Sequence, residues 1–130
     1  MQGFGHVGIQ TAKHLTKEGA KLLVADVHEE ARKKAQQLGA TLVEPENIYE
    51  IPCDIFSPCA LGGVLNSDTI PKLRCTIVAG GANNQLLNDK DGDALKKRGI
   101  LYGPDYIINA GGLIQDNPEA TGAGCTSANQ

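Results

Sequence analysis

The sequence has no tryptophan, and aromatic residues make up only 4% of it. No signal peptide is visible in it, and it has no run of about 18 apolar residues, the length that a membrane-spanning helix needs. Its formal net charge is −3, and no basic patch alternates with aromatic residues, which argues against nucleic acid as a partner. These absences predict a cytoplasmic protein that has neither membrane nor nucleic acid as a partner.

The spacing of the cysteines does not fit a metal site. The four cysteines are Cys53, Cys59, Cys75 and Cys125; none forms a C-x-x-C pair, and the three histidines lie far from them in the sequence. We therefore expect no zinc or other metal site, and no disulfide framework in a reducing compartment. Cys53 and Cys75 lie in apolar segments and are expected to be small buried hydrophobic residues.

Hydrophobic residues make up 41% of the 130 residues, which is enough for the core of one domain. With so few aromatic residues, that core must be built from valine, isoleucine, leucine and alanine. This composition suits a parallel β-sheet covered by helices.

Glycine, in contrast, is abundant, and three glycines near the start fit the spacing G-x-G-x-x-G. Gly3 would permit a tight turn, Gly5 would let a pyrophosphate approach the backbone, and Gly8 would let the next helix pack close to a sheet. That helix would begin near His6 and direct its N–H groups at the phosphates. The alternative is a glycine-rich turn without a ligand, because 16 glycines can produce this spacing by chance.

An acidic residue stands where a dinucleotide-binding fold requires one. The expected strand 21–25 ends in Asp26, 18 positions after Gly8, where a carboxylate would accept hydrogen bonds from the adenosine ribose. A carboxylate there favours NAD over NADP, since it repels a 2′-phosphate, although His28 and Arg32 nearby would weaken that preference. The alternative is an ordinary aspartate at the end of a strand.

The remaining pattern alternates helices and strands. We expect helices over 6–18, 28–38 and 84–98, the last of them broken near 88–92. Residues 44–52 are expected to be a loop or short helix, and residues 66–73 a short helical segment. Strands are expected at 21–25, 40–43, 53–56, 76–79 and 100–102. This order predicts an α/β, Rossmann-type, doubly wound parallel sheet. Only Met1 and Gln2 precede Gly3, so the first, central strand is expected to be largely missing at the N-terminus.

Three turns rich in glycine, asparagine and small residues follow three of these strands. They cover 57–63, 80–85 and 104–112. Each alone could be a tight connection, but together they outline a groove that could grip ribose and nicotinamide. The sequence therefore predicts a truncated NAD-binding domain over 1–115, and residues 116–130, which have no large apolar side chain, are expected to be a divergent, disordered tail.

Four segments resemble the C-terminal, NAD-binding domain of the Glu/Leu/Phe/Val dehydrogenase family, with the leucine and phenylalanine dehydrogenases nearest. They occur in family order, and the last three are long and distinctive: QGFGHVG at 2–8, CDIFSPCALGG at 53–63, AGGANNQL at 79–86 and GPDYIINAGG at 103–112.

The resemblance implies an oxidoreductase that deaminates a branched-chain or aromatic L-amino acid to its 2-oxo acid, with ammonium and NADH as the other products. By position, Gly5, His6 and Val7 would face the pyrophosphate of NAD, beside Gly3 and Gly8 of the same motif. The other cofactor contacts that it implies are Asp26 at the adenosine ribose, Cys59 and Ala60 at the ribose site through backbone atoms, Asn83 at the nicotinamide ribose and Asn109 at the carboxamide. Capping of turns is the alternative role for the two asparagines.

In this family the catalytic lysine and the acid–base aspartate come from an N-terminal domain, so the resemblance assigns no catalytic residue here. The isolated chain is expected to be inactive and to meet its amino-acid or 2-oxo-acid substrate only when a catalytic domain is supplied. Full-length family members are expected to be homo-oligomers. The alternatives are a non-catalytic NAD(H)-binding module and an inactive fragment.

Overall fold

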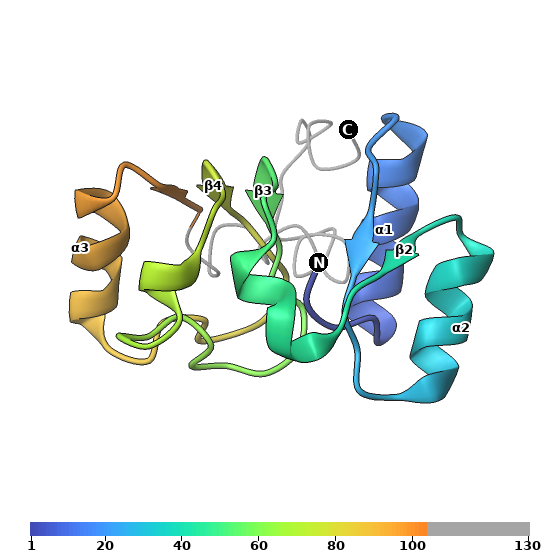
Figure 1. Ribbon diagram of the computed structural model, residues 1–130, viewed down its shortest axis with the longest axis horizontal. Coiled ribbons are helices and arrows are strands. Elements are labelled where there is room, and N and C mark those ends of the chain that lie inside the picture. Colours follow the sequence, from blue (N-terminus) through green and yellow to red (C-terminus); the bar gives the residue numbers. More distant parts are fainter. Residues whose placement is uncertain (104–130) are drawn as a thin grey trace, which may run out of the picture.

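The computed structural model describes residues 1–103, which form an α/β structure (Figure 1). The helices are α1 (His6–Lys17), α2 (Glu29–Gln37) and α3 (Asp89–Lys97); the 3₁₀ segments are η1 (Pro45–Glu50) and η2 (Ile70–Lys72); the strands are β1 (Leu23–Val24), β2 (Thr41–Leu42), β3 (Ile55–Phe56), β4 (Ile77–Val78) and β5 (Leu101–Tyr102). The order of helices and strands confirms the predicted α/β class.

The five strands form two small parallel sheets, β1–β2 and β3–β4–β5. Gln2 makes parallel bridges to Ala25, next to β1, and to Pro58, next to β3. The N-terminal segment therefore lies between the two sheets, as Figure 1 shows at the N label, and the order across the structure is β2, β1, residues 1–3, β3, β4, β5. Residues 1–3 thus lie in the middle of this order.

Helix boundaries follow local signals with two corrections. Gly19 and Gly39 follow α1 and α2 with φ of +84° and +85°, so they end these helices as expected. The helix predicted over 84–98 begins only at Asp89, because the Asn88 N–H donates to the Asp91 carboxylate at 2.8 Å and fixes the start there.

The other correction concerns the segment 66–73, of which only η2 is helical. The Asn66 side-chain oxygen accepts hydrogen bonds from the N–H groups of Asp68 and Thr69, at 2.9 and 3.1 Å. These bonds form a turn in which the two N–H groups are paired with a side chain instead of with helical carbonyls. Only a single 3₁₀ turn follows in this segment.

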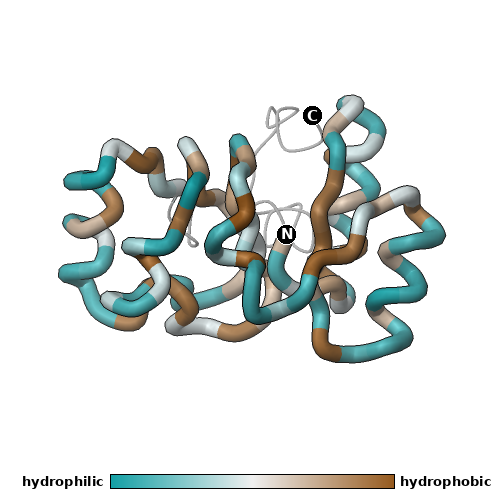
Figure 2. Tube along the Cα trace, in the orientation of Figure 1, coloured by the Kyte–Doolittle hydropathy of each residue, from teal (hydrophilic) through white to brown (hydrophobic). Residues whose placement is uncertain are grey.

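The core consists of two hydrophobic clusters. One includes Leu65, Leu95 and Val78 in the part built on β3, β4 and α3; the other includes Phe4 and Val24 with small residues of α1 and α2. Figure 2 shows the corresponding apolar colouring along the strands and hydrophilic colouring along the helices. The clusters contain the predicted aliphatic residues, and within residues 1–103 no helix is long and apolar enough to cross a membrane.

The prediction that Cys53 and Cys75 are buried is wrong: both are half-buried and pack against the edge of the first cluster. The boundary at residue 115, the tail 116–130 and Cys125 lie outside the described residues.

The half-buried thiols predict a loss of stability in alkaline solution. Burial raises the pKa of both Cys53 and Cys75 above the ordinary value of 9.0, since the thiolate is disfavoured away from water. The folded chain therefore keeps these protons where the unfolded chain releases them, and the stability they contribute is lost as the pH rises above about 9. Urea unfolding from about pH 8 to about pH 10 should show the decline.

The matched chain is Cys53→Ser with Cys75→Ser; both chains carry Cys125→Ser and are kept under reductant so that disulfides do not interfere. Serine does not titrate in this range, so the double variant should lose less stability over the same interval. Equal declines in both chains would show that the two thiols do not contribute.

Candidate functional site

The glycines of the first turn are packed against the turn that follows β3. Gly3 has φ of +93°, and a Cβ on it would lie 2.6 Å from the Cβ of Ala60. A Cβ on Gly8 would lie 2.5 Å from the Gly3 carbonyl oxygen. Gly5, in contrast, would meet nothing within 4 Å. Gly3 and Gly8 are thus required for packing, whereas Gly5 leaves a bare stretch of backbone open to a ligand.

Asp26 fixes this turn to the end of β1. Its carboxylate accepts a hydrogen bond from the Phe4 N–H at 2.7 Å through one oxygen and from the His28 N–H at 2.8 Å through the other. Asp26 itself is half-buried. The predicted ribose carboxylate is therefore also a structural residue that joins the glycine turn to the start of α2.

The N-terminus of α1 is open. Gly5 is its N-cap, no side chain caps it, and no acidic residue occupies its first turn. His6 and Val7 are exposed, Val7 at 47%. In contrast, α2 begins with Glu29 and Glu30 and α3 with acidic residues of its own. The unpaired N–H groups and the dipole of α1 therefore favour an anion at this end.

The turns after β3 and β4 are packed against each other beside the glycine turn. The Ala82 N–H donates to the Pro58 carbonyl at 3.0 Å, and a Cβ on Gly80 would overlap that same carbonyl at 2.2 Å. A Cβ on Gly62 would lie 2.9 Å from the carbonyl oxygens of Asn83 and Asn84. The three turns 3–8, 57–63 and 80–85 thus meet at one edge, which we call the carboxyl edge.

The remaining predicted residues of this edge differ in exposure. Cys59 is buried, its N–H donates to the Gln2 carbonyl at 2.7 Å, and its Sγ lies 3.4 Å from the Ser57 hydroxyl. Ala60 and Asn83 are exposed. Asn109 lies outside the described residues, so the structure does not place it. Among residues 1–103 no group of His, Cys, Asp and Glu could hold a metal ion.

Gln85 is a residue of this edge whose role the sequence did not reveal. Its side chain is 0% exposed, and its amide nitrogen donates to the carbonyls of Gly80 and Ala82, both at 2.8 Å. It therefore fixes the shape of the turn that carries Asn83. The only signal in the sequence was a long polar side chain at the end of a run of small residues.

Arg32, one of the two basic residues expected near Asp26, already has polar partners. The Arg32 guanidinium donates to the Asp26 backbone carbonyl at 3.4 Å and forms an ion pair with Glu44 at 3.3 Å. Glu44 offsets the positive charge that Arg32 would bring to this corner. The pair is partly exposed, so it contributes little to stability.

Because Gly5 and Gly8 have different surroundings, we expect a methyl group to lower the free energy of unfolding by different amounts at the two positions. Gly8→Ala should lower the free energy of unfolding by about 2 kcal/mol or more, because its Cβ collides with backbone. Gly5→Ala should cost less than about 1 kcal/mol, the usual difference between glycine and alanine at an N-cap. Chemical denaturation measures both; equal costs would contradict the packing described for Gly8.

Curated proteins that match this chain are amino-acid dehydrogenases by name. Leucine dehydrogenase of Thermoactinomyces intermedius is 50% identical over 123 residues, and phenylalanine dehydrogenase of Lysinibacillus sphaericus is 48% identical over 128 residues; each match covers 94% of this chain and 34% of the relative. L-tryptophan dehydrogenase of Nostoc punctiforme is 52% identical over 124 residues, covering 94% of this chain and 35% of that protein. The chain thus spans about a third of the length of these relatives.

Solved structures that match this chain are also amino-acid dehydrogenases by title. The crystal structure of L-tryptophan dehydrogenase from Nostoc punctiforme superposes with a TM-score of 0.86 at 50% identity, covering 98% of this chain and 39% of that one. Hetero-hexameric glutamate dehydrogenase from Thermus thermophilus, in its Leu-bound form, gives a TM-score of 0.74 at 25% identity, covering 91% of this chain and 32% of that one. The model of the Glutamate/Leucine/Phenylalanine/Valine dehydrogenase family matches residues 23–121, and the chain belongs to that family.

Proposed function

We propose that this chain is the NAD-binding portion, the C-terminal domain, of an NAD-dependent L-amino-acid dehydrogenase. The proposal has three parts: a Rossmann-type sheet, a cofactor held at the carboxyl edge, and catalytic groups supplied from outside the chain. Each part is supported by different residues.

The order of strands supports the Rossmann-type sheet. Counting residues 1–3 as a strand, the order β2, β1, 1–3, β3, β4, β5 corresponds to the order 3-2-1-4-5-6 of doubly wound dinucleotide-binding folds. In such folds the dinucleotide binds outside the carboxyl ends of the strands, where the strand order reverses. Here that point lies between residues 1–3 and β3, next to the glycine turn.

The observation that carries the proposal is the contact between Asp26 and the glycine turn. The Phe4 N–H bond holds the carboxylate beside Gly5, whose backbone is open, and beside the uncapped start of α1. A carboxylate for ribose hydroxyls and a helix N-terminus for a pyrophosphate are therefore adjacent. The residues present fit the adenosine half of NAD.

The same corner supports NAD rather than NADP. A 2′-phosphate would lie near the Asp26 carboxylate and be repelled by it. Arg32 is the cation best placed to compensate, but its guanidinium already pairs with Glu44 and with the Asp26 carbonyl. We therefore expect discrimination against NADP.

For the nicotinamide half, we assign Cys59 and Ala60 to the ribose site through backbone atoms, Asn83 to the nicotinamide ribose and Asn109 to the carboxamide. The packing of turn 57–63 against turn 80–85 supports the first three, since it brings them to the carboxyl edge. Gln85 would act as a positioning residue, because it holds the backbone that carries Asn83.

The bound cofactor would accept hydride from the α-carbon of the amino acid. We propose that a catalytic lysine and an acid–base aspartate come from another domain of the protein. Lys13, Lys17 and Lys21 on or beside α1 are exposed, away from the packed turns, and suit a solvated surface. The names of the relatives support a branched-chain or aromatic amino acid as substrate.

NAD binding to the purified chain tests the cofactor site. Calorimetric titration should give saturable binding, tighter for NAD than for NADP. Asp26→Ala should weaken NAD binding about tenfold or more by removing a charged hydrogen-bond partner. The same substitution should also reduce the preference of the chain for NAD over NADP.

Two further variants separate binding from folding. Asp26→Ala frees the Phe4 and His28 N–H groups, so circular dichroism must first show that it is folded. Gly5→Ala leaves packing intact and should still weaken NAD binding, because its methyl group occupies the space left for the pyrophosphate. Asp68→Ala, an exposed aspartate outside the three turns, is the control and should change nothing. A folded wild-type chain that does not bind NAD would overturn the proposal.

Turnover tests the placement of the catalytic groups. The isolated chain should produce no NADH from leucine, valine or phenylalanine, because hydride transfer needs the amino acid to be positioned and its amine deprotonated. Absorbance at the NADH band, with a full-length leucine dehydrogenase as the positive control, makes the measurement. Turnover by this chain alone would show that it contains a catalytic base.

A further inference from the structure

A short stretch of backbone pairing connects the turn after β3 to the turn after β4. It consists of three hydrogen bonds, which run from the Gly63 N–H to the Asn84 carbonyl at 2.7 Å, from the Leu65 N–H to the Gln85 carbonyl at 2.9 Å and from the Leu87 N–H to the Leu65 carbonyl at 3.0 Å. We call this pairing of residues 63–65 with residues 84–87 the joint. Because turns 57–63 and 80–85 both end in the joint, it determines how far apart Ala60 and Asn83 lie.

The backbone of the joint has little freedom where the two turns meet. Asn84 has φ of +50°, in the left-handed region that residues other than glycine rarely adopt. A Cβ on Gly62 would lie 2.9 Å from the carbonyl oxygens of Asn83 and Asn84, so the two turns are in close contact there. The Gly63 N–H is the donor that bonds to the Asn84 carbonyl. A displacement of Gly63 would therefore move the backbone next to Asn83.

The side chain of Asn66 fixes Gly63 through its other backbone group. The amide nitrogen of this side chain donates to the Gly63 carbonyl at 3.1 Å. The amide oxygen accepts from the N–H groups of Asp68 and Thr69, and the Thr69 hydroxyl accepts from the Asn66 N–H at 3.1 Å and donates to the Val64 carbonyl. One end of the amide thus forms the 66–69 turn, and the other end connects that turn to the joint.

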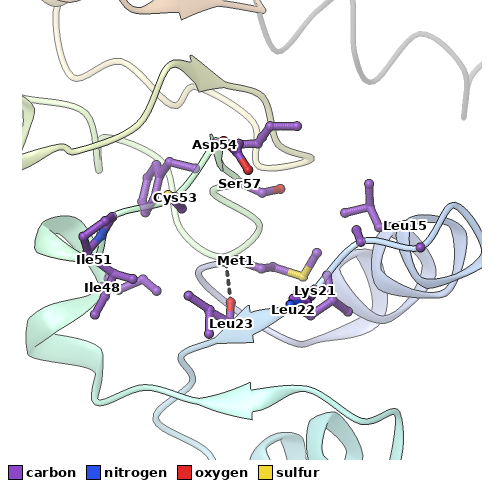
Figure 3. A pocket seen from close by; sticks show the side chains of 15 residues that line it. Met1, Leu15, Lys21, Leu22, Leu23, Ile48, Ile51, Cys53, Asp54 and Ser57 are labelled. Carbon is purple, nitrogen blue, oxygen red and sulfur yellow. Dashed lines mark hydrogen bonds between the residues drawn. The ribbon is translucent and has the colours of Figure 1, made fainter.

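These contacts are separate from the groove beside Met1 that Figure 3 shows. The groove has a volume of about 610 Å³ and is lined by residues such as Leu15, Leu23 and Ile51, but by none of residues 58–87. The bonds of the joint and of Asn66 all lie within residues 63–87. The joint is therefore built by one continuous stretch of the chain.

We propose that Asn66 is a positioning residue for the nicotinamide half of the cofactor site. Its bond to the Gly63 carbonyl fixes the joint, and the joint fixes the spacing of Ala60 and Asn83. This role rests on the proposed NAD-binding function. It deepens that function, because Asn66 would act through the backbone of two turns without touching the cofactor.

The adenosine half is built by other contacts. Asp26 bonds to the Phe4 N–H, and Gly5 leaves open backbone at the start of α1, far along the chain from Asn66. ADP carries the adenosine and two phosphates, whereas NAD adds the second ribose and the nicotinamide. The ratio of the dissociation constants of ADP and NAD therefore measures what the nicotinamide half contributes.

Two substitutions remove the bond to Gly63 and keep the 66–69 turn. In Asn66→Ser and Asn66→Asp, the side-chain oxygen can still accept from the backbone N–H groups of this turn. An ionised aspartate has no donor, and the serine side chain is too short to reach the Gly63 carbonyl. Ser67→Asp is the control for charge, because it adds a carboxylate at the neighbouring exposed position and leaves the Asn66 amide in place.

Calorimetric titration of the full 130-residue chain compares the two ligands. Both Asn66 variants should bind NAD about fivefold or more weakly, because the residues for its nicotinamide half are displaced. Their affinity for ADP should stay within about twofold of the wild-type value, since its contacts lie elsewhere. Ser67→Asp should bind both ligands as the wild-type chain does. A purely electrostatic effect would instead weaken ADP at least as much as NAD, because ADP carries the larger negative charge.

Hydrogen exchange reads the joint without any ligand. After circular dichroism has shown that the variants are folded, the Gly63 N–H should exchange about tenfold or more faster in both of them than in the wild-type chain. The Ile9 N–H, which donates to the Gly5 carbonyl in α1, is the internal control and should exchange at an unchanged rate.

Failure of the cofactor function and failure of the positioning role give different results. No NAD binding by a folded wild-type chain would overturn the proposed function and this role with it. If the wild-type chain binds NAD, the role alone would be overturned by unchanged NAD affinity in both Asn66 variants, by equal losses for NAD and ADP, or by unchanged exchange at Gly63. Unfolding of both variants would also overturn it, because Asn66 would then be required for the fold as a whole.

Discussion

Five backbone hydrogen bonds to Met1, Gln2 and Gly3 hold the two sheets together in the described part of the chain. Neither sheet alone brings the first glycine turn next to the turns after β3 and β4. Because Gln2 bridges both sides, the end of β1 and the end of β3 lie on either side of residues 1–3, and Asp26, Gly5 and Ala60 come to one edge. The proposed cofactor site therefore depends on three residues of N-terminal backbone.

Close backbone contact is the second constraint, and it explains why so many turn residues are small. Gly3 against Ala60, Gly8 against the Gly3 carbonyl, and Gly80 against Pro58 each leave no space for a further carbon atom. Gly5 is the exception within the same turn. The contrast separates glycines that build the edge from the one that leaves it accessible, a distinction that the motif spacing alone does not contain.

Much of this arrangement could be predicted from the sequence, for identifiable reasons. Helical and strand patterns alternate along the chain, and Gly19 and Gly39 end two of the helices, so the sequence predicts the α/β class. The start of α3 was not, because the Asn88–Asp91 capping box competes with a longer helical pattern. The burial of Gln85 and the half-exposure of Cys53 and Cys75 depend on tertiary neighbours, which no local pattern encodes. The position of Asp26 at the end of a strand was predicted from the sequence, but its hydrogen bonds to the Phe4 and His28 N–H groups were not.

The division of the core into two clusters has a consequence for how the chain opens. Val24 belongs to one cluster and Ala25, the next residue, to the other, so adjacent residues contribute to different cores. Local unfolding follows such cooperative units rather than the whole molecule. We therefore expect the part built on α1 and α2 to lose its packing in a different step from the part built on α3, and a ligand that contacts both parts to stabilise them together.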